Sequence, residues 1–172
     1  MGFPGLYIDI EKIRHNTAHI TRLCGEKGIE VMGVTKGVCG LLPVAKAMLE
    51  GGAKKLGDSR LKNIKKLREA GIQDQIYLIR LPMLSEVNDA VLCCDGSLNS
   101  EVRVIKALSD AAEAVGKTHK IILMVDVGDL REGIMPGDTI EVINKIIELP
   151  AIELEGLGTN LGCYGGVLAS FE

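Results

Sequence analysis

Short apolar runs rich in β-branched residues alternate with helical segments along the whole chain. Residues 31–35 and 120–126 are typical runs, and neither leaves room for the regular polar alternation of a half-exposed strand. Strands of this kind are buried on both faces, as in parallel sheets covered by helices. The alternation therefore predicts an α/β fold of repeated βα units. We expect parallel strands at 6–10, 31–35, 54–57, 76–81, 95–98, 120–126 and 154–160.

The segments between these runs have helical periodicity and recognisable helix ends. Asp9 stands ahead of a predicted helix at 11–27, and Asn99 or Ser100 ahead of another at 101–115. Two further helices have apolar faces that stop at glycines. Their residues are Val44, Ala47 and Met48 before Gly51, and Leu61, Ile64 and Leu67 before Gly71.

Lys36 comes directly after the apolar run 31–35 and is followed by Gly37. The carboxyl end of a parallel strand faces the crevice or barrel mouth where α/β proteins bind ligands. Partial desolvation at such a place favours a neutral amine, which can attack a carbonyl group. Lys36 is thus a candidate Schiff-base nucleophile, and the alternative is that it begins a solvated loop.

Polar side chains gather at the ends of the other predicted strands as well. In a parallel barrel these ends meet on one face, where such enzymes keep their chemistry. Helix capping is the alternative for Asp58, Ser59 and Ser100. Capping does not explain the remaining strand-end residues, which are Lys36, Arg80, Arg131 and Asn160.

Composition excludes several classes of partner. The net charge is −3, the 20 Lys and Arg are dispersed among 23 Asp and Glu, and there is no Trp. A nucleic-acid-binding stripe is therefore not expected. The longest apolar runs, such as 121–125, have strand length, and residues 1–5 lack the pattern of a signal peptide. We expect a cytoplasmic protein with no membrane association.

Five cysteines at irregular spacing predict reduced thiols rather than a disulfide framework. Cys93 and Cys94, if they lay in a strand, would point to opposite faces. Cys39 follows Lys36 by three residues, and a packing role is expected for it.

A set of segments spread over nearly the whole chain forms a recognisable pattern. They are Tyr7-Ile8-Asp9-Ile10, Gly33-Val34-Thr35-Lys36-Gly37, Gly57-Asp58-Ser59-Arg60, Arg80-Leu81-Pro82-Met83, Ser97-Leu98-Asn99-Ser100-Glu101, Val125-Asp126-Val127-Gly128-Asp129-Leu130-Arg131-Glu132-Gly133 and Asn160-Leu161-Gly162-Cys163-Tyr164. Together these segments resemble the amino-terminal domain of the alanine racemase family, and within it the ornithine racemase branch.

The resemblance implies a TIM-barrel enzyme that uses pyridoxal 5'-phosphate to racemise an amino acid such as ornithine or alanine. Lys36 would hold the cofactor as an internal aldimine and act as one base. Arg131 would contact the cofactor phenolate or the substrate carboxylate. Arg80, Asn99 and Asn160 are the further cofactor contacts that we expect.

The sequence also departs from the family pattern. Asn160 stands where alanine racemases carry a ring-contacting histidine, and Gly40 where they carry a phosphate-contacting tyrosine. The ring environment and phosphate site must therefore differ locally. The second base is expected to be Tyr164, with Cys163 as the alternative.

Length suggests an incomplete barrel. A complete TIM barrel needs about 250 residues and eight strands, whereas residues 1–172 supply about six. We expect an amino-terminal part of the barrel domain, with open sheet edges, that binds the cofactor poorly and racemises slowly on its own. The family also implies a homodimer.

Three other functions share some of these features. A non-catalytic protein that holds pyridoxal phosphate for cofactor homeostasis would keep Lys36 but not turn over amino acids. A Schiff-base aldolase would trap a carbonyl substrate on Lys36 without the cofactor. A glycine-rich nucleotide site at 156–166 is weaker, because its spacing matches no phosphate-binding fingerprint. His15 and His19 share a helix face, but no metal spacing accompanies them.

Overall fold

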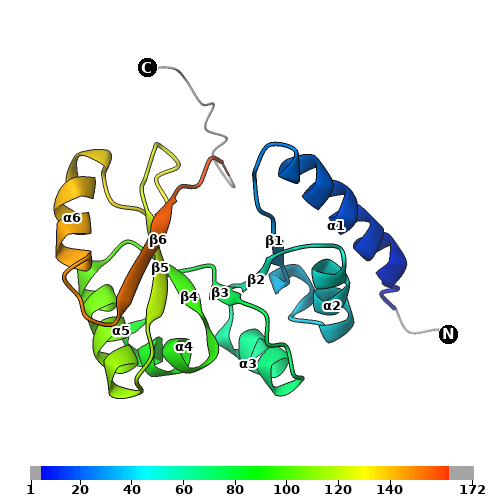
Figure 1. Ribbon diagram of the computed structural model, residues 1–172, viewed down its shortest axis with the longest axis horizontal. Helices are drawn as coiled ribbons and strands as arrows, with labels where there is room; N and C mark the ends of the chain where they lie inside the picture. The colour runs from blue at the N-terminus through cyan, green and yellow to red at the C-terminus, as the bar shows by residue number, and fades with distance from the viewer. Residues whose placement is uncertain (1–4, 163–172) are drawn as a thin grey trace. The chain divides into compact units, whose positions relative to one another are not determined.

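The computed structural model describes residues 5–162, and the chain divides into two compact units, 1–76 and 77–172. Helices and parallel strands alternate within each unit, which confirms the predicted α/β class (Figure 1). Six strands are present in the described part of the chain. No helix in that part is long and apolar enough to span a membrane.

The first unit consists of two parallel βα pairs preceded by a helix. Strands β1 and β2 pair in parallel, with Gly33 opposite Leu56 and Val34 opposite Gly57. A short helical turn, η1, follows β1 directly, so the strand ends immediately before the segment that carries Lys36. The elements are α1 (Ile10–Gly25), β1 (Met32–Val34), η1 (Lys36–Val38), α2 (Leu42–Glu50), β2 (Lys55–Asp58) and α3 (Leu61–Glu69).

Helix α1 begins where the sequence predicts, but the strand expected ahead of it is absent. The Asp9 carboxylate accepts a hydrogen bond from Lys12 N at 3.0 Å and caps the helix. The predicted strand at 6–10 is wrong, because this cap starts the helix at Ile10. Helix α1 is fastened to the end of α2 by the Thr21 hydroxyl, which donates to the Gly51 carbonyl at 2.8 Å.

The second unit continues the βα alternation. Its strands pair in parallel in chain order, β3 with β4, β4 with β5 and β5 with β6. The elements are β3 (Ile76–Leu78), η2 (Leu84–Glu86), α4 (Val87–Cys93), β4 (Gly96–Asn99), α5 (Val102–Ala114), β5 (His119–Met124), η3 (Pro136–Asp138), α6 (Thr139–Ile146) and β6 (Ile152–Gly158).

A core between β5 and its covering helices defines the two faces of this sheet. Ile121 and Leu123 of β5 pack against side chains of α5 and α6, and Figure 1 shows these helices on one side of the strands. The parallel register sets Ser97 opposite Ile121 and Asn99 opposite Leu123. Ser97 and Asn99 therefore share the helix-facing side of the sheet. The buried core consists of Ile105, Ile121, Leu123, Val142 and Ile146.

One local prediction for this unit, the residue that caps helix α5, is wrong. Helix α5 starts at Val102 after Glu101, which makes no side-chain cap, so neither Asn99 nor Ser100 caps it. Cys93 is the last residue of α4 and Cys94 follows it, so this pair does not lie in a strand. The described cysteines Cys24, Cys39, Cys93 and Cys94 are all free thiols.

Candidate active site

Lys36 is the first residue of η1, directly after β1. Its side chain is exposed, and among the described residues its amine makes no hydrogen bond or ion pair. The expectation of a partly desolvated amine is therefore not met in the described structure, because strand β1 stops at Val34 and Lys36 is exposed in the turn that follows. Exposure alone does not distinguish a loop residue from a functional one, so the contacts of the neighbouring residues matter as well.

A buried polar network lies next to Lys36 along the chain. Thr35 and Asp58 are both fully buried, and the Thr35 hydroxyl donates to Asp58 Oδ2 at 2.8 Å. The other carboxylate oxygen, Oδ1, accepts from Arg60 N at 2.9 Å and from Asn63 Nδ2 at 3.0 Å. Asp58 is thus not a helix cap: the residue before α3 is Arg60, and it makes no side-chain cap bond.

The turn after Lys36 closes back on Thr35. The Val38 and Gly40 amides donate to the Thr35 carbonyl at 3.1 and 3.2 Å. Cys39 and Gly40 have positive φ values of 52° and 61°, which reverse the chain direction before α2. Gly40, where a tyrosine is expected from the family, is needed here because a Cβ would lie 2.9 Å from Asn63 Cβ.

In the second unit, Arg131 lies on a loop that is organised by Asp126. Asp126 Oδ1 accepts hydrogen bonds from the amides of Gly128 and Leu130 at 2.9 and 3.1 Å. The loop closes where Asp126 N donates to the Ile134 carbonyl at 2.9 Å. Sequence reasoning quoted Asp126 within a motif without assigning it a role, and a carboxylate that begins a glycine-containing loop is the signal for one.

Glu132 connects two of the predicted site residues. Arg131 Nε lies 2.8 Å from Glu132 Oε2, and Asn160 Nδ2 donates to Glu132 Oε1 at 3.2 Å. The structure therefore brings Arg131 and Asn160 together through one carboxylate, which the sequence did not single out. The guanidinium is exposed and keeps its terminal nitrogens available to an anionic ligand.

The same loop carries a buried carboxylate. Both carboxylate oxygens of Asp129 are buried, and neither has a hydrogen-bond partner within the part of the chain that the structure describes. A buried anion without a partner is costly, so the carboxylate is suited to a cationic ligand.

Arg80 is held by an acidic side chain rather than left open. Arg80 Nη1 and Nη2 each donate to Glu86 at 2.8 Å, and Nη1 also donates to the Leu81 carbonyl at 2.9 Å. The Arg80 hydrogen bond lowers the pKa of Glu86 below its ordinary value. The pair fixes the loop between β3 and α4, and the predicted cofactor contact of Arg80 stays a prediction that this geometry does not favour.

Asn99 points to the helix-facing side of β4. Its amide nitrogen donates to Ser97 Oγ at 2.9 Å, and Ser97 Oγ lies 2.9 Å from His119 Nε2. Burial lowers the pKa of His119 to about 4, so its imidazole is neutral near pH 7. This network is part of the sheet–helix interface, and a cofactor contact from Asn99 also stays a prediction that its position does not favour.

The opposite face of the strands carries a second buried polar group that sequence reasoning missed. The Tyr77 hydroxyl donates to Glu155 Oε2 at 2.5 Å, and burial together with this carboxylate raises the pKa of Tyr77. The Tyr77 ring packs over Gly96, where a Cβ would lie 2.5 Å from the ring, so only glycine leaves room for it. No pattern in the sequence links residues this far apart.

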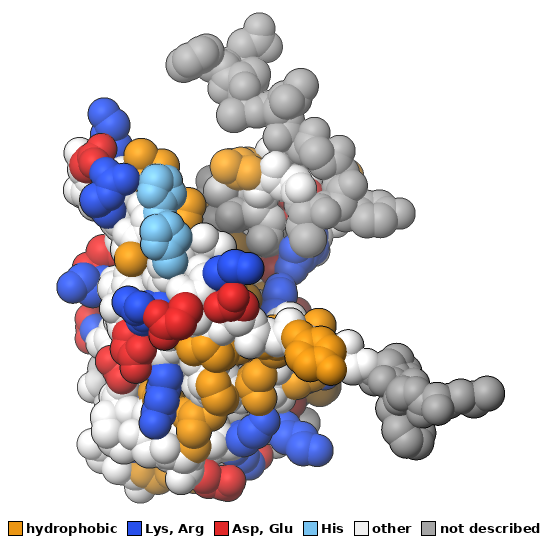
Figure 2. Space-filling model, turned by 90° about the vertical axis from the view of Figure 1, so that its right-hand side faces the viewer, with side chains coloured by type: hydrophobic (Ala, Val, Ile, Leu, Met, Phe, Trp, Pro, Cys, Tyr) orange, Lys and Arg blue, Asp and Glu red, His pale blue; other side chains and the backbone are white. Residues whose placement is uncertain are grey.

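The remaining predicted positions have no contacts within the described residues that assign them a role. Tyr164 and Cys163, the candidates for the second base, lie outside the described residues. His15 and His19 are exposed on α1 (Figure 2). Across residues 5–162 no three His, Cys, Asp or Glu side chains are grouped so that they could hold a metal ion.

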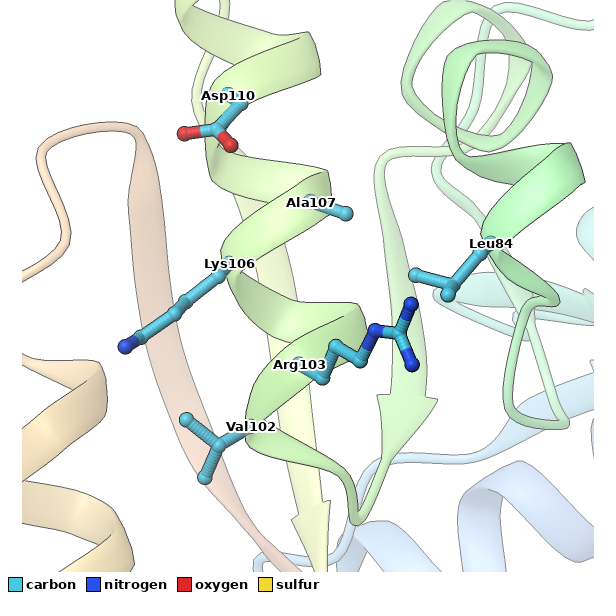
Figure 3. Close-up of a pocket in the computed structure, with 6 residues that line it drawn as sticks. All are labelled: Leu84, Val102, Arg103, Lys106, Ala107 and Asp110. Atoms are coloured by element: carbon cyan, nitrogen blue, oxygen red, sulfur yellow. The ribbon is translucent and has the colours of Figure 1, made fainter.

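The groove in Figure 3 is separate from these residues. It has a volume of about 540 Å³ and lies along helix α5, with the Arg103 side chain directed toward Leu84 and Lys106 directed away. None of the predicted catalytic or cofactor residues lines it. The predicted site residues therefore do not lie in this groove.

The fold and the polar residues at the strand ends define a class of protein, the parallel α/β proteins that place their functional side chains at the carboxyl ends of strands. The sequence profile of the alanine racemase N-terminal domain matches residues 8–170. The chain belongs to the alanine racemase N-terminal domain family, as its motifs indicated.

Comparison with individual proteins gives the same family. The chain is 41% identical over 167 residues to the ornithine racemase of Acetoanaerobium sticklandii, covering 96% of this chain and 47% of that protein. It is 35% identical over 172 residues to the lysine racemase of Thermotoga maritima, covering 100% and 48%. The alanine racemase structure from Streptomyces lavendulae superposes with a TM-score of 0.76 at 26% identity, covering 91% and 42%. The chain thus spans about half the length of the curated relatives it matches.

Proposed function

We propose that this chain belongs to a pyridoxal 5'-phosphate-dependent amino-acid racemase, with Lys36 as the amine that holds the cofactor. The observation that carries the proposal is a lysine at the carboxyl end of a parallel strand whose amine has no partner among residues 5–162, in a chain similar to ornithine and lysine racemases. The coverage of these relatives supports the further proposal that residues 1–172 are the amino-terminal part of a barrel domain.

The described residues fit this cofactor in their chemistry. When bound, pyridoxal phosphate supplies an electron sink that acidifies the α-proton of an amino acid. Lys36 Nζ is free to bond covalently to an aldehyde and to accept or return a proton on one side of the substrate. Arg131 would hold a carboxylate or phenolate oxygen, with Glu132 and Asn160 orienting its guanidinium. Tyr164 stays the proposed base for the other side.

We further propose a substrate with a basic side chain. The names of the two relatives support this class, and a cationic side chain needs an anionic partner in the site. Asp129 offers one, because its carboxylate is buried without a partner among the described residues and lies two residues before Arg131. L-Norvaline has the chain length of L-ornithine without the terminal amine, so comparing KM for the two amino acids measures this preference.

Family membership also supports a homodimer, and the four free thiols suit a reducing compartment such as the cytoplasm. Sedimentation equilibrium of the purified protein measures the first of these two properties.

The direct test is reduction of the protein with borohydride in the presence of pyridoxal phosphate, followed by peptide mapping. The 172-residue chain and the full product of its gene are compared. Lys36→Ala removes the proposed amine, and Lys46→Ala removes an exposed lysine of helix α2 in the same unit as a matched control. We expect an adduct on Lys36 that is lost only in Lys36→Ala, and inversion of L-ornithine by the full product.

Other outcomes identify the rival functions. An adduct on Lys36 with no turnover of any amino acid by the full product would indicate a cofactor-holding protein. Reduction that traps a carbonyl substrate on Lys36 without added cofactor would indicate an aldolase. Absence of any Lys36 adduct in the full product would refute the pyridoxal proposal.

A further inference from the structure

We propose that Asp58 is a positioning residue for Lys36, which it reaches through Thr35 and Asn63. The inference rests on the proposed role of Lys36 as the amine that holds the cofactor. The Lys36 amine is exposed and has no partner in the described part of the chain, so the backbone that carries it determines where it lies. The position of the Lys36 amine therefore depends on the interactions that fix the segment from Thr35 to Gly40.

Asp58 fixes the beginning of this segment. Thr35 is fully buried, its amide donates to the Gly57 carbonyl at 2.9 Å, and its hydroxyl donates to Asp58 Oδ2 at 2.8 Å. A hydrogen bond to a buried carboxylate is stronger than one between neutral groups. The residue directly before Lys36 is thus held at both its backbone and its side chain.

The same carboxylate fixes the end of the segment through Asn63. Asn63 Nδ2 donates to Asp58 Oδ1 at 3.0 Å, and the Asn63 backbone and Cβ lie against Gly40 so closely that a Cβ on Gly40 would approach to 2.9 Å. Gly40 N in turn donates to the Thr35 carbonyl at 3.2 Å. Both ends of the turn that carries Lys36 therefore rest on one residue.

Both carboxylate oxygens of the buried Asp58 accept hydrogen bonds. Asp58 accepts hydrogen bonds from Thr35 Oγ1, Arg60 N and Asn63 Nδ2. Two of these donors, Thr35 and Asn63, hold the two ends of the turn that carries Lys36, and we call them with Asp58 the clamp. A catalytic group must be held by neighbours whose own conformations are fixed. In addition to the backbone pairing of β1 with β2, the Asp58 side chain thus links the two ends of the Thr35–Gly40 segment.

The test uses Thr35→Val, which keeps the side-chain volume and removes the hydroxyl, and Thr35→Ser, which restores it. Thr21→Val is the matched control, since it removes a hydroxyl that donates to the Gly51 carbonyl at 2.8 Å in the same unit. Two quantities are measured in each variant. One is the rate at which pyridoxal phosphate forms a borohydride-trapped adduct on Lys36, and the other is the hydrogen exchange of the Val38 and Gly40 amides.

In Thr35→Val we expect adduct formation to be about tenfold slower, which corresponds to about 1.4 kcal/mol. Exchange at Val38 and Gly40 should be faster by a similar factor. Thr35→Ser should resemble the wild type, and Thr21→Val should lower the melting temperature without changing either quantity. Asn63→Ala removes the second arm of the clamp and should give the same pattern if Thr35→Val does not fold.

A folded Thr35→Val protein with wild-type adduct and exchange rates would overturn the proposal, as would equal effects from Thr21→Val. The adduct rates are measured in the full gene product, and if the wild-type product forms no Lys36 adduct, the proposed function fails. The exchange rates then still decide whether Asp58 holds the Lys36 turn, because they require no cofactor.

Discussion

His119 is predicted to make the stability of this protein depend on pH. The imidazole is almost fully buried, beside Ser97 Oγ at 2.9 Å, and burial lowers its pKa from 6.5 to about 4. The negative charge of Asp95 opposes this shift and the positive charge of Lys117 adds to it. Near neutral pH the folded and unfolded chains both hold a largely neutral His119.

The stability falls with falling pH because the unfolded chain binds a proton on His119 at a higher pH than the folded chain does. Between pH 6.5 and pH 4 the unfolded chain takes up a proton on His119 that the folded chain refuses, so the stability falls as the pH falls through this window. With pKa values of 6.5 and about 4, the free energy of unfolding decreases by about 2 kcal/mol between pH 7 and pH 5. Below pH 4 both states are protonated and the loss is complete.

Urea unfolding at pH 7, 6 and 5 measures this effect in the wild type and in His119→Gln. Glutamine fills much of the same space and can hydrogen bond to Ser97, but it does not titrate. We expect His119→Gln to be less stable than the wild type at pH 7 and to lose that disadvantage toward pH 5. Parallel pH dependences in the two proteins would refute the reasoning, since they would assign the effect to other groups.

Two further predictions concern the loop that carries Arg131. Asp129→Asn should raise the free energy of unfolding by about 1 kcal/mol in denaturant unfolding, because it removes a buried charge that lacks a hydrogen-bond partner in the described region. The same substitution should raise the KM for L-ornithine in steady-state kinetics of the full gene product. Gly133→Ala should destabilise the chain by about 1–3 kcal/mol, since φ is 153° and a Cβ would lie 2.4 Å from Asp126 N, whereas Gly137→Ala, with open space around it, should have little effect on thermal unfolding.

The local sequence was sufficient to predict the parallel α/β class and the place of Lys36. Buried parallel strands typically form from continuous apolar runs, and the helices between them have apolar residues on one side. Both patterns can therefore be recognised in consecutive residues. Asp9 caps α1 as predicted for the same reason, because a cap acts over three residues. The strand predicted at 6–10 failed where two local signals competed and the helix cap prevailed.

The tertiary structure decided what each polar side chain at a strand end does. The sequence suggests that Asp58 is a helix cap, yet it accepts hydrogen bonds from Thr35, which follows strand β1, and from Asn63 within α3. Asn99 reads as a site residue, yet the register with β5 turns it toward the helices. Strand register reverses the facing of every side chain when it shifts by one residue, and it is set by contacts between distant segments. Consecutive residues therefore determined the fold and its lysine, whereas long-range packing determined the partners of its polar side chains.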